Sequence, residues 1–480
     1  MRLTVGEIVA ATGGELLAGD TVAVATSFHI DSRVLLPGGA FVALIAERDG
    51  HEYVNDAFAR GASVAIVTRA VEGVKARPGQ AMVRVGDALE ALAALGRLAR
   101  HRLSASAVVA ITGSSGKTAT KNLTAAALAP GRTVHASPGS FNNEWGVPLS
   151  LLGAEPGTDA VVLEMGARFA GNLTYLCAIA RPQIGVVTNL GLAHAEFLGG
   201  SDGVARVKGE LVEALLPDGV AVLNADDELT GKLAARTRAR VVTVGFSAGA
   251  DVRIADLLLD EELRPRFRLE TPWGALDVEL GVRGEHQAVN AAMAAAVALE
   301  LGVAAGDVAA GLASCAGEAW RMELVRCPNG VLVLNDAYNA NPSSMAAAIR
   351  SLGQLPSTGR RIAVLGGMRE LGEQSAPEHA AVGRLVGAST VDVLVVVGHE
   401  GQSIAAGARR LRRLLEIVEV PDADAARDAV RTLVRPGDVV LVKGSRAVGL
   451  ERVASSLAGA GSGTGSSAGS GSSAVERTSP

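Results

Sequence analysis

Apolar runs of strand length that alternate with helical stretches are the feature of this sequence that most restricts its fold. In the middle of the chain these runs cover residues 107–111, 160–163, 184–187, 220–223 and 241–244. Helix-forming segments separate them, and this order predicts βαβ units that build a mostly parallel sheet. Between residues 251 and 280 the pattern changes to alternating strands around Pro272-Trp273-Gly274, which predicts a hairpin-like insert. An alanine-rich helix is expected at 286–301.

A similar alternation returns in the last third of the chain. Strand-like runs cover residues 331–334, 362–365, 393–397, 415–418 and 439–442. They predict a second, smaller, Rossmann-like sheet between about 318 and 458. Residues 459–480 consist almost entirely of Gly, Ser, Ala and Thr, a composition that cannot bury a core and that predicts a disordered tail.

The first part of the chain has shorter elements. β-like runs at 41–45 and 64–67 alternate with expected helices at 53–60 and 88–100, the last of which leads into the central block. A chain of 480 residues is too long for one ordinary domain. We therefore expect an α/β protein with three domains, and their predicted bounds are 1–85, 86–317 and 318–458.

Charge and cysteine content exclude several classes of protein. The 45 Lys and Arg against 50 Asp and Glu give a formal net charge of −5, so no basic surface indicates nucleic acid or anionic lipid as a partner. The three cysteines form no Cys-x-x-Cys pair, which argues against a disulfide framework or a zinc cluster. We find no signal segment after Met1 and no membrane span, so the cytoplasm is the expected compartment.

Residues 108–119 combine a buried strand, a glycine-rich turn and the start of a helix. The turn has the sequence Thr112-Gly113-Ser114-Ser115-Gly116-Lys117-Thr118, and the helix is expected to begin near Ala119. Glycines let backbone N–H groups approach a phosphate, and a helix N-terminus adds positive potential. Lys117 can reach the β and γ oxygens of a nucleotide, and the Thr118 hydroxyl can bind Mg²⁺. Although Ile111 stands where the longer Gly-x4-Gly-Lys form has its first glycine, this context favours phosphate binding over a plain turn.

A phosphoryl-transfer site needs oxygen ligands for its metal, and three residues are candidates. Glu164 ends the strand at 161–163, so we expect it at the carboxyl edge of the sheet, where ligands bind. His194 follows the strand that ends in Thr188-Asn189, and Lys208 lies in the helix-like segment 204–216. A solvated strand end, a polar loop residue and a helix-surface cation are the alternative explanations. Sequence position alone leaves these alternatives open.

Together these pieces resemble the Mur ligase family, the ATP-dependent amide-forming enzymes of peptidoglycan precursor synthesis, over the chain up to about residue 458. In the first block, Asp31-Ser32-Arg33 and Asp49-Gly50-His51 resemble the family's uridine-diphosphate-binding domain. The resemblance implies that Ser32 and Arg33 contact the substrate's nucleotide, and the planar guanidinium of Arg33 suits a pyrophosphate or a carbonyl edge. Taken alone, Asp-Ser-Arg is more often a capped turn.

In the central block, residues 112–118 match the family's ATP loop. The segment Ser140-Phe141-Asn142-Asn143-Glu144 matches its substrate-contacting segment, so Asn142 and Asn143 are implied to bind substrate. Glu164 matches a first-metal carboxylate, His194 a second-metal ligand, and Lys208 the lysine that CO₂ carbamylates in this family. The resemblance thus implies magnesium ligands at Thr118, Glu164, His194 and the Lys208 carbamate, and it implies that Lys117, Glu164, His194 and Lys208 are catalytic. His286 and Asn290 match the segment whose Asn contacts adenine.

In the third block, Arg321 and the stretch Asn335-Asp336-Ala337-Tyr338-Asn339-Ala340-Asn341-Pro342 match the branch of the family that adds D-alanyl-D-alanine. The resemblance implies that Asp336 contacts the ATP ribose and that Arg321 approaches the nucleotide as the domain closes. The implied substrate-binding residues here are Tyr338, Asn339, Asn341, Lys443 and Arg446. Ala46 and Gly367 depart from the family, which usually carries a glycine at the first position and an acidic residue at the second.

The resemblance implies an amide ligase that uses ATP and Mg²⁺. Its implied substrates are UDP-N-acetylmuramoyl-tripeptide, whose carboxylate becomes an acyl phosphate, and D-alanyl-D-alanine, whose amine then displaces phosphate. The three domains would hold the UDP sugar, the ATP and the dipeptide. We expect no nucleic-acid partner and a monomer.

Other interpretations stay open. The ligase that adds the third peptide residue usually carries an Asp-Asn-Pro-Arg motif in its last domain, which this sequence lacks. Folylpolyglutamate synthetase shares the ATP domain and lacks the uridine-binding block. A paralogue that joins a different amine to a different carboxylate and a non-catalytic ATP-binding scaffold are the two remaining alternatives.

Overall fold

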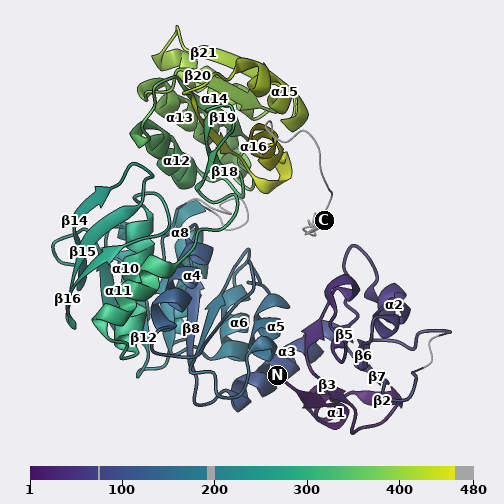
Figure 1. Ribbon diagram of the computed structural model, residues 1–480. Helices are drawn as coiled ribbons and strands as arrows, with labels where there is room; N and C mark the ends of the chain where they lie inside the picture. The colour runs from purple at the N-terminus through teal and green to yellow at the C-terminus, as the bar shows by residue number, and fades with distance from the viewer. Residues whose placement is uncertain (74–75, 192–199, 460–480) are drawn as a thin grey trace.

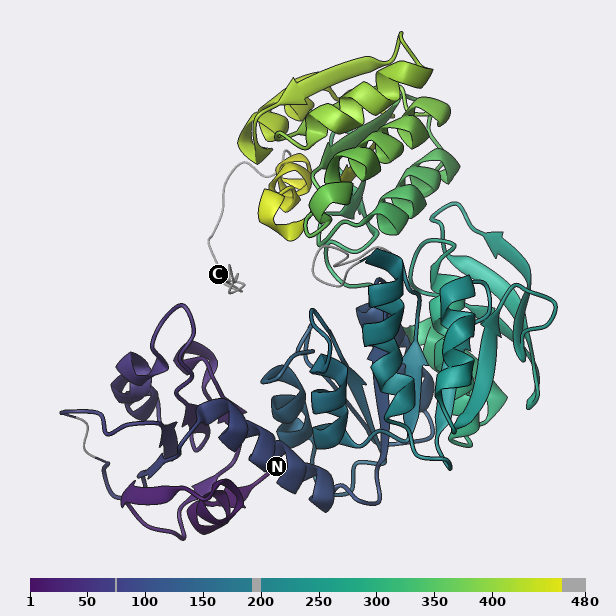
Figure 2. The same cartoon turned by 180° about the vertical axis from the view of Figure 1, so that it is seen from behind.

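The computed structural model describes residues 1–73, 76–191 and 200–459. Over these ranges the chain forms three α/β domains, with the first and third domains on different sides of the middle one (Figure 1; Figure 2). No helix within the described ranges combines the length and the apolar character that crossing a bilayer requires. The expected tail after Gly459 and the loop that contains His194 lie outside these ranges.

The first domain is built around a small mixed sheet. Its elements are β1 (Leu3–Thr4), α1 (Val5–Thr12), β2 (Glu15–Ala18), β3 (Val24–Ala25), β4 (Phe28–His29), β5 (Ala40–Val42), α2 (Val54–Ala59), β6 (Val64–Val67) and β7 (Ala81–Arg84). The strand order is β2-β7-β6-β5-β4, and every pair except β2–β7 is parallel. The Thr4 and Glu7 side chains form a capping box that starts α1.

The middle domain is the largest. Its helices are α3 (Ala88–Arg102), α4 (Lys117–Leu128), α5 (Gly146–Gly153), α6 (Asn172–Ala180), α8 (Gly200–Glu213), α9 (Glu228–Lys232), α10 (Gln287–Glu300) and α11 (Ala305–Ser314). Its strands are β8 (Ala107–Thr112), β9 (Val134–Ala136), β10 (Ala160–Glu164), β11 (Ile184–Val187), β12 (Val220–Asn224), β13 (Arg240–Gly245), β14 (Val252–Leu259), β15 (Pro265–Thr271) and β16 (Gly274–Glu279).

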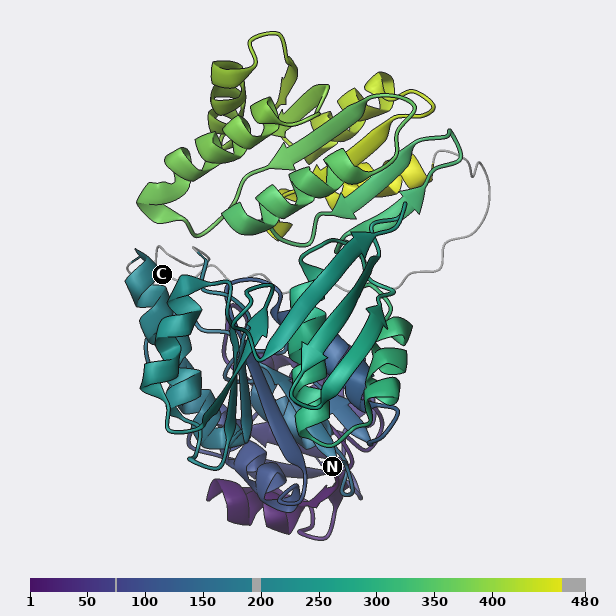
Figure 3. The same cartoon turned by 90° about the vertical axis from the view of Figure 1, so that its left-hand side faces the viewer.

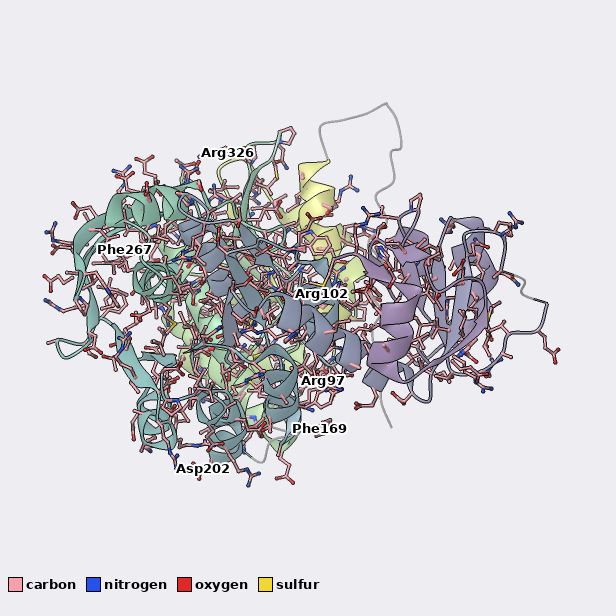
Figure 4. All side chains as sticks on the ribbon, turned by 90° about the horizontal axis from the view of Figure 1, so that it is seen from below. Arg97, Arg102, Phe169, Asp202, Phe267 and Arg326 are labelled. Atoms are coloured by element: carbon pink, nitrogen blue, oxygen red, sulfur yellow. The ribbon has the colours of Figure 1, made fainter. Side chains whose placement is uncertain are left out.

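Strands β8 to β13 form the predicted parallel sheet, with β11, β8 and β10 as neighbours. Their carboxyl ends therefore meet at one edge, which brings Thr112 beside Glu164 and the residues after Val187. Helix α3 joins this domain to the first one. Arg102 at its end donates to the Arg2 carbonyl at 3.1 Å, and Figure 4 places Arg102 near the first domain.

The expected hairpin-like insert is a continuation of the middle sheet. β14 pairs with β13 in parallel, and β15 pairs antiparallel with both β14 and β16, so the segment extends the sheet instead of standing apart from it. Figure 3 shows these strands rising toward the third domain. At the β14–β15 turn, Leu263 is buried in the same apolar cluster as Met322 and Leu334. This turn therefore packs against the core of the third domain.

The third domain is the predicted Rossmann-like sheet. Its elements are β17 (Glu323–Arg326), β18 (Leu332–Asp336), α12 (Pro342–Gln354), β19 (Arg361–Gly366), α13 (Ser375–Ala388), β20 (Val393–Val397), α14 (Gly401–Leu411), β21 (Glu416–Val420), α15 (Ala423–Leu433), β22 (Val439–Lys443) and α16 (Glu451–Ala458). The order is β17-β18-β22-β19-β20-β21, parallel except at β17–β18. Separate apolar clusters pack on its two faces.

Candidate active site

Gly113 and Gly116 shape the turn between β8 and α4. Gly113 has a φ of 148°, and a Cβ there would lie 1.9 Å from Thr188 Oγ1. Gly116 has a φ of 81°, and a Cβ there would lie 2.8 Å from Asn290 Oδ1. Both conformation and space therefore require glycine. Helix α4 begins at Lys117, two residues before the expected start, and N–H groups at a helix start lack intrahelical acceptors and suit an anion.

The residues after β11 hold this turn in place. The Ser114 N–H donates to the Asn189 carbonyl at 2.9 Å, and the Ser115 N–H donates to Asn189 Oδ1 at 3.1 Å. The Thr188 hydroxyl donates to the Ser115 carbonyl at 2.6 Å. Sequence reasoning identified Thr188 and Asn189 only as a strand end and missed this role. A polar pair that follows a buried strand at the binding edge is the sign that points to it.

Lys117 folds back over the turn that precedes it. Its Nζ donates to the Gly113 carbonyl at 2.8 Å. Burial lowers the pKa of Lys117, and the nearby charge of Glu164 acts in the opposite direction. The lysine and the carboxylate are thus electrostatic neighbours at one edge of the sheet, as their positions in the sequence predicted.

Glu164 is the last residue of β10, and it is only 2% exposed. Its Oε1 accepts a hydrogen bond from Asn142 Nδ2 at 2.8 Å. Its Oε2 is buried and accepts no hydrogen bond from the part of the chain that the structure describes. A buried carboxylate oxygen without a partner is costly, and a cation at that oxygen would offset the cost. Glu164 is therefore not the solvated strand end of the alternative explanation.

Lys208 lies in α8 and is only 1% exposed, so it is not a helix-surface cation. Its Nζ makes no hydrogen bond or ion pair with the described residues. Burial, and then the charge of Lys117, lower the pKa of Lys208 to about 7. An uncharged amine is the form that reacts with CO₂, so this environment suits a carbamate.

The predicted magnesium site fits the donors that are present. Glu164 Oε2 and the Thr118 hydroxyl are oxygen donors of the kind that Mg²⁺ prefers, and a carbamate at Lys208 would add another. His194 lies outside the described residues. Within the described ranges, no group of three His, Cys, Asp or Glu side chains is placed to hold a metal. The metal ligands stay a prediction.

The neighbouring residues Asn142 and Asn143 make different contacts. Asn142 reaches Glu164, and its carbonyl accepts from the Gly166 N–H at 2.7 Å. Asn143 Oδ1 accepts from the Gly146 N–H at 3.0 Å, which orders the start of α5. Next to them, Ser140 Oγ is 2.9 Å from the Tyr338 hydroxyl of the third domain.

Asn290 is 6% exposed and packs beneath the phosphate turn, not on a helix surface. Its Oδ1 accepts from the Thr120 hydroxyl at 3.2 Å, and its Nδ2 donates to Gln287 Oε1 at 2.9 Å. The bond with Thr120 ties α10 to α4, and the bond with Gln287 lies within α10. His286 stands at the N-cap position of α10. Adenine contact by Asn290 stays a prediction.

Arg321 brings the third domain to the phosphate turn. Its guanidinium donates to Thr118 Oγ1 at 3.1 Å, pairs with Glu318 at 2.8 Å and lies 3.8 Å from the centre of the Tyr338 ring. Its neighbours Trp320 and Met322 have φ values of 63° and 51°, a strained region for residues with side chains. In this state a cation already contacts the hydroxyl that we expect to bind magnesium.

The other predicted residues of the third domain make contacts within that domain. Asp336 at the end of β18 pairs with Lys443 at the end of β22, and Lys443 also donates to the Asn339 carbonyl at 3.0 Å. The Arg446 guanidinium lies 4.2 Å from the Trp320 ring centre. Asn341 accepts from the Ser344 N–H at 2.9 Å and caps α12. For Asn341, the local explanation of an Asn-rich turn accounts for its contacts.

The first domain holds its predicted pair on a short 3₁₀ turn. Asp31 caps this turn and pairs with the exposed Arg33 at 2.7 Å. The Ser32 hydroxyl donates to Asp56 at 2.7 Å. This is the capped turn that the sequence allowed, and substrate contact by Ser32 and Arg33 stays a prediction.

Gly367 leaves room for a carboxylate from another loop. A Cβ at position 367 would lie 3.1 Å from Glu400 Cβ and 3.2 Å from Glu400 Oε2. The Glu400 side chain thus fills the space in which an acidic side chain at 367 would begin. The Gly367 carbonyl accepts from the Ser445 N–H at 3.0 Å, so this loop lies beside the segment that carries Arg446.

Comparison with known proteins agrees with this architecture. The family model described as Mur ligase middle domain matches residues 111–298, and the one described as Mur ligase, glutamate ligase domain matches residues 320–446. The UDP-N-acetylmuramoyl-tripeptide–D-alanyl-D-alanine ligase of Mycobacterium tuberculosis (strain ATCC 25618 / H37Rv) is 42% identical over 505 residues. That alignment covers 95% of this chain and 98% of the relative.

Solved structures give the same result. MurF from Acinetobacter baumannii superposes with a TM-score of 0.85 at 31% identity, covering 95% of this chain and 99% of that one. The MurF ligase of Thermotoga maritima in complex with ADP gives a TM-score of 0.75 at 31% identity, covering 90% and 96%. The resemblance inferred from the motifs is therefore confirmed, and this chain is a member of the Mur ligase family.

Proposed function

We propose that this chain is an ATP-dependent amide ligase that joins D-alanyl-D-alanine to UDP-N-acetylmuramoyl-tripeptide in peptidoglycan precursor synthesis. The observation that carries the proposal is the meeting of the phosphate turn, Glu164 and Lys208 in the middle domain of a chain whose M. tuberculosis relative bears the name of this ligase. A carboxylate does not acylate an amine by itself, because its oxygen is a poor leaving group. ATP converts it to an acyl phosphate, from which phosphate leaves.

The residues of the phosphate turn would position the nucleotide. The N–H groups at the start of α4 and the Lys117 ammonium would take up negative charge as the γ-phosphate is transferred. To bind the phosphate, Lys117 would exchange its bond with the Gly113 carbonyl for one with a phosphate oxygen. When bound, Mg²⁺ would neutralise phosphate charge, and Thr118, Glu164, His194 and the Lys208 carbamate are its proposed ligands.

Lys208 is proposed to act as the carbamate because its surroundings disfavour the ammonium. Only the neutral amine adds to CO₂, and a pKa of about 7 leaves a large neutral fraction near neutral pH. A carbamate would also supply the negative charge that the neighbouring Lys117 attracts.

The three domains, proposed at 1–85, 86–317 and 318–458, would divide the substrates. Ser32 and Arg33 would bind the uridine diphosphate, and the third domain would deliver the dipeptide. Arg321 now donates to the Thr118 hydroxyl, so binding of metal and nucleotide would require that guanidinium to move toward the phosphates. Asp336 and Asn290 would contact ribose and adenine.

Phosphate release with each substrate omitted in turn tests the proposal. We expect phosphate release only when ATP, Mg²⁺, UDP-N-acetylmuramoyl-tripeptide and D-alanyl-D-alanine are all present. The mass of the product should equal the summed masses of the tripeptide and dipeptide substrates less one water. ATP binding without turnover would favour the scaffold. Turnover that prefers another dipeptide or another carboxylate in a substrate panel would favour the paralogue.

A further inference from the structure

Lys121 is a buried lysine in α4, one helical turn after Lys117. It is 2% exposed, and its Nζ donates to the Ser137 and Gly139 carbonyls, each at 2.7 Å. Among the described residues, no carboxylate hydrogen-bonds to it. Its two acceptors are backbone groups in one loop, the loop that follows β9.

That loop leads directly to Glu164. The Ser137 N–H donates to the Val162 carbonyl at 2.9 Å, and the Ser137 hydroxyl accepts from the Glu164 N–H at 3.3 Å. Farther along, Asn142 donates its amide to Glu164 Oε1 at 2.8 Å. The loop therefore contacts β10 at both ends, and Lys121 bonds to its residues 137 and 139.

Burying an apolar side chain in the space of Lys121 would cost less free energy than burying a charged lysine. Burial lowers the pKa of Lys121, and the charges of Glu164 and Glu318 oppose this effect. Without the lysine, however, the Ser137 and Gly139 carbonyls would lose their donor, and Ser137 is itself buried. The hydrogen bonds to these two carbonyls thus offset the free-energy cost of burying this lysine, and they order the loop.

We propose that Lys121 is a positioning residue that fastens the 137–142 loop to the phosphate-turn helix and thereby holds the Asn142 amide against Glu164. This rests on the proposed ligase function. Lys121 and Lys117 are four residues apart on α4, so the loop takes its position from the helix that carries the phosphate turn. Removal of the lysine leaves the phosphate turn intact and lets Asn142 and Glu164 drift relative to it.

The test compares Lys121→Met with Lys232→Met. Methionine keeps the length and apolar stem of lysine and removes the donors, and Lys232 is a 65% exposed control that pairs with Glu228. We expect kcat of Lys121→Met to fall about 10²-fold, because displacement of a reacting group by about 1 Å has such an effect. The KM for ATP is expected to stay within about twofold, since the phosphate turn is unchanged.

A second pair of variants tests the route through Asn142. If Lys121 acts by holding Asn142, then Asn142→Ala added to Lys121→Met will reduce kcat little further. If the two residues act independently, the fold-decreases in kcat of the single variants will multiply in the double variant. Lys121→Arg keeps donors with a different reach and is expected to give an intermediate kcat at the wild-type KM for ATP.

Hydrogen exchange gives a readout that does not need activity. Amides 137–146 are expected to exchange faster in Lys121→Met than in wild type or Lys232→Met, with α4 unchanged. Any of three results would overturn the proposal: a wild-type kcat per folded molecule in Lys121→Met, fold-decreases in kcat that multiply when Asn142→Ala is added, or amide exchange at 137–146 that is the same as in wild type. If Lys121→Met does not fold, a wild-type kcat in Lys121→Arg would overturn it and an intermediate one would support it. If wild type itself makes no product, the ligase proposal fails, and the exchange comparison still decides the role of Lys121.

Discussion

Replacement of Lys208 with methionine is expected to stabilise the protein while it abolishes ligation. Lys208 is 1% exposed and has no hydrogen bond or ion pair to the described residues, so its charged form is penalised in the fold. Burial and the charge of Lys117 lower its pKa from 10.5 to about 7. Methionine has a similar shape and carries no charge, so it removes the penalty.

The size and the sign of the effect follow from proton linkage. Between pH 7 and 10.5 the unfolded chain holds a proton on this lysine that the folded chain does not, so the free energy of unfolding falls as the pH is lowered through this window. Each pKa unit corresponds to about 1.4 kcal/mol, which gives a penalty of about 3 kcal/mol at pH 8 and about 5 kcal/mol below pH 7. Above 10.5 the lysine is neutral in both states and the penalty vanishes.

Urea unfolding followed by tryptophan fluorescence measures the difference. Trp145, Trp273 and Trp320 lie in the predicted middle domain or just beyond its end, so their signal follows this region. In buffer free of CO₂ and Mg²⁺ we expect the free energy of unfolding of Lys208→Met to exceed that of wild type by about 3 kcal/mol at pH 8 and by less than about 1 kcal/mol at pH 10. Lys232→Met is the control. Equal stabilities at pH 8, or a difference that does not change with pH, would refute the reasoning.

Three further outcomes are expected. Lys117→Ala or Glu164→Ala should each cut turnover by at least ~10²-fold in a phosphate-release assay, and near-normal turnover would exclude the role given to that residue. Lys208→Ala should be inactive and partly rescued by added short carboxylates, and an active variant insensitive to CO₂ would remove Lys208 from the site. Gly367→Asp should destabilise the protein by about 1 to 3 kcal/mol in thermal unfolding, because its Cβ would lie 3.1 Å from that of Glu400. Adding Glu400→Gly should restore stability, and a single variant as stable as wild type would contradict the crowding.

Patterns in the sequence were enough to predict the α/β class, the parallel middle sheet, the Rossmann-like last sheet and the turn before Lys117. The strands, helices and turn are set by residues close together in the chain, and their βαβ order favours parallel pairing of the strands. Apolar alternation selects strands and helices, and glycines at 113 and 116 allow a φ that other residues resist. The motif matches also identified the family, which the comparisons confirmed.

The neighbours of each polar side chain could be found only from the packing of the folded chain. The same pattern that predicts a strand end at Glu164 or a helix at Lys208 is compatible with solvent exposure, yet both are buried. No sequence motif identified Lys121, whose two carbonyl partners lie 16 and 18 residues farther along the chain. Contacts of this kind depend on how whole elements pack, and local preference carries no information about them. For the same reason the link between Arg321 and Thr118, 203 residues apart, required the fold.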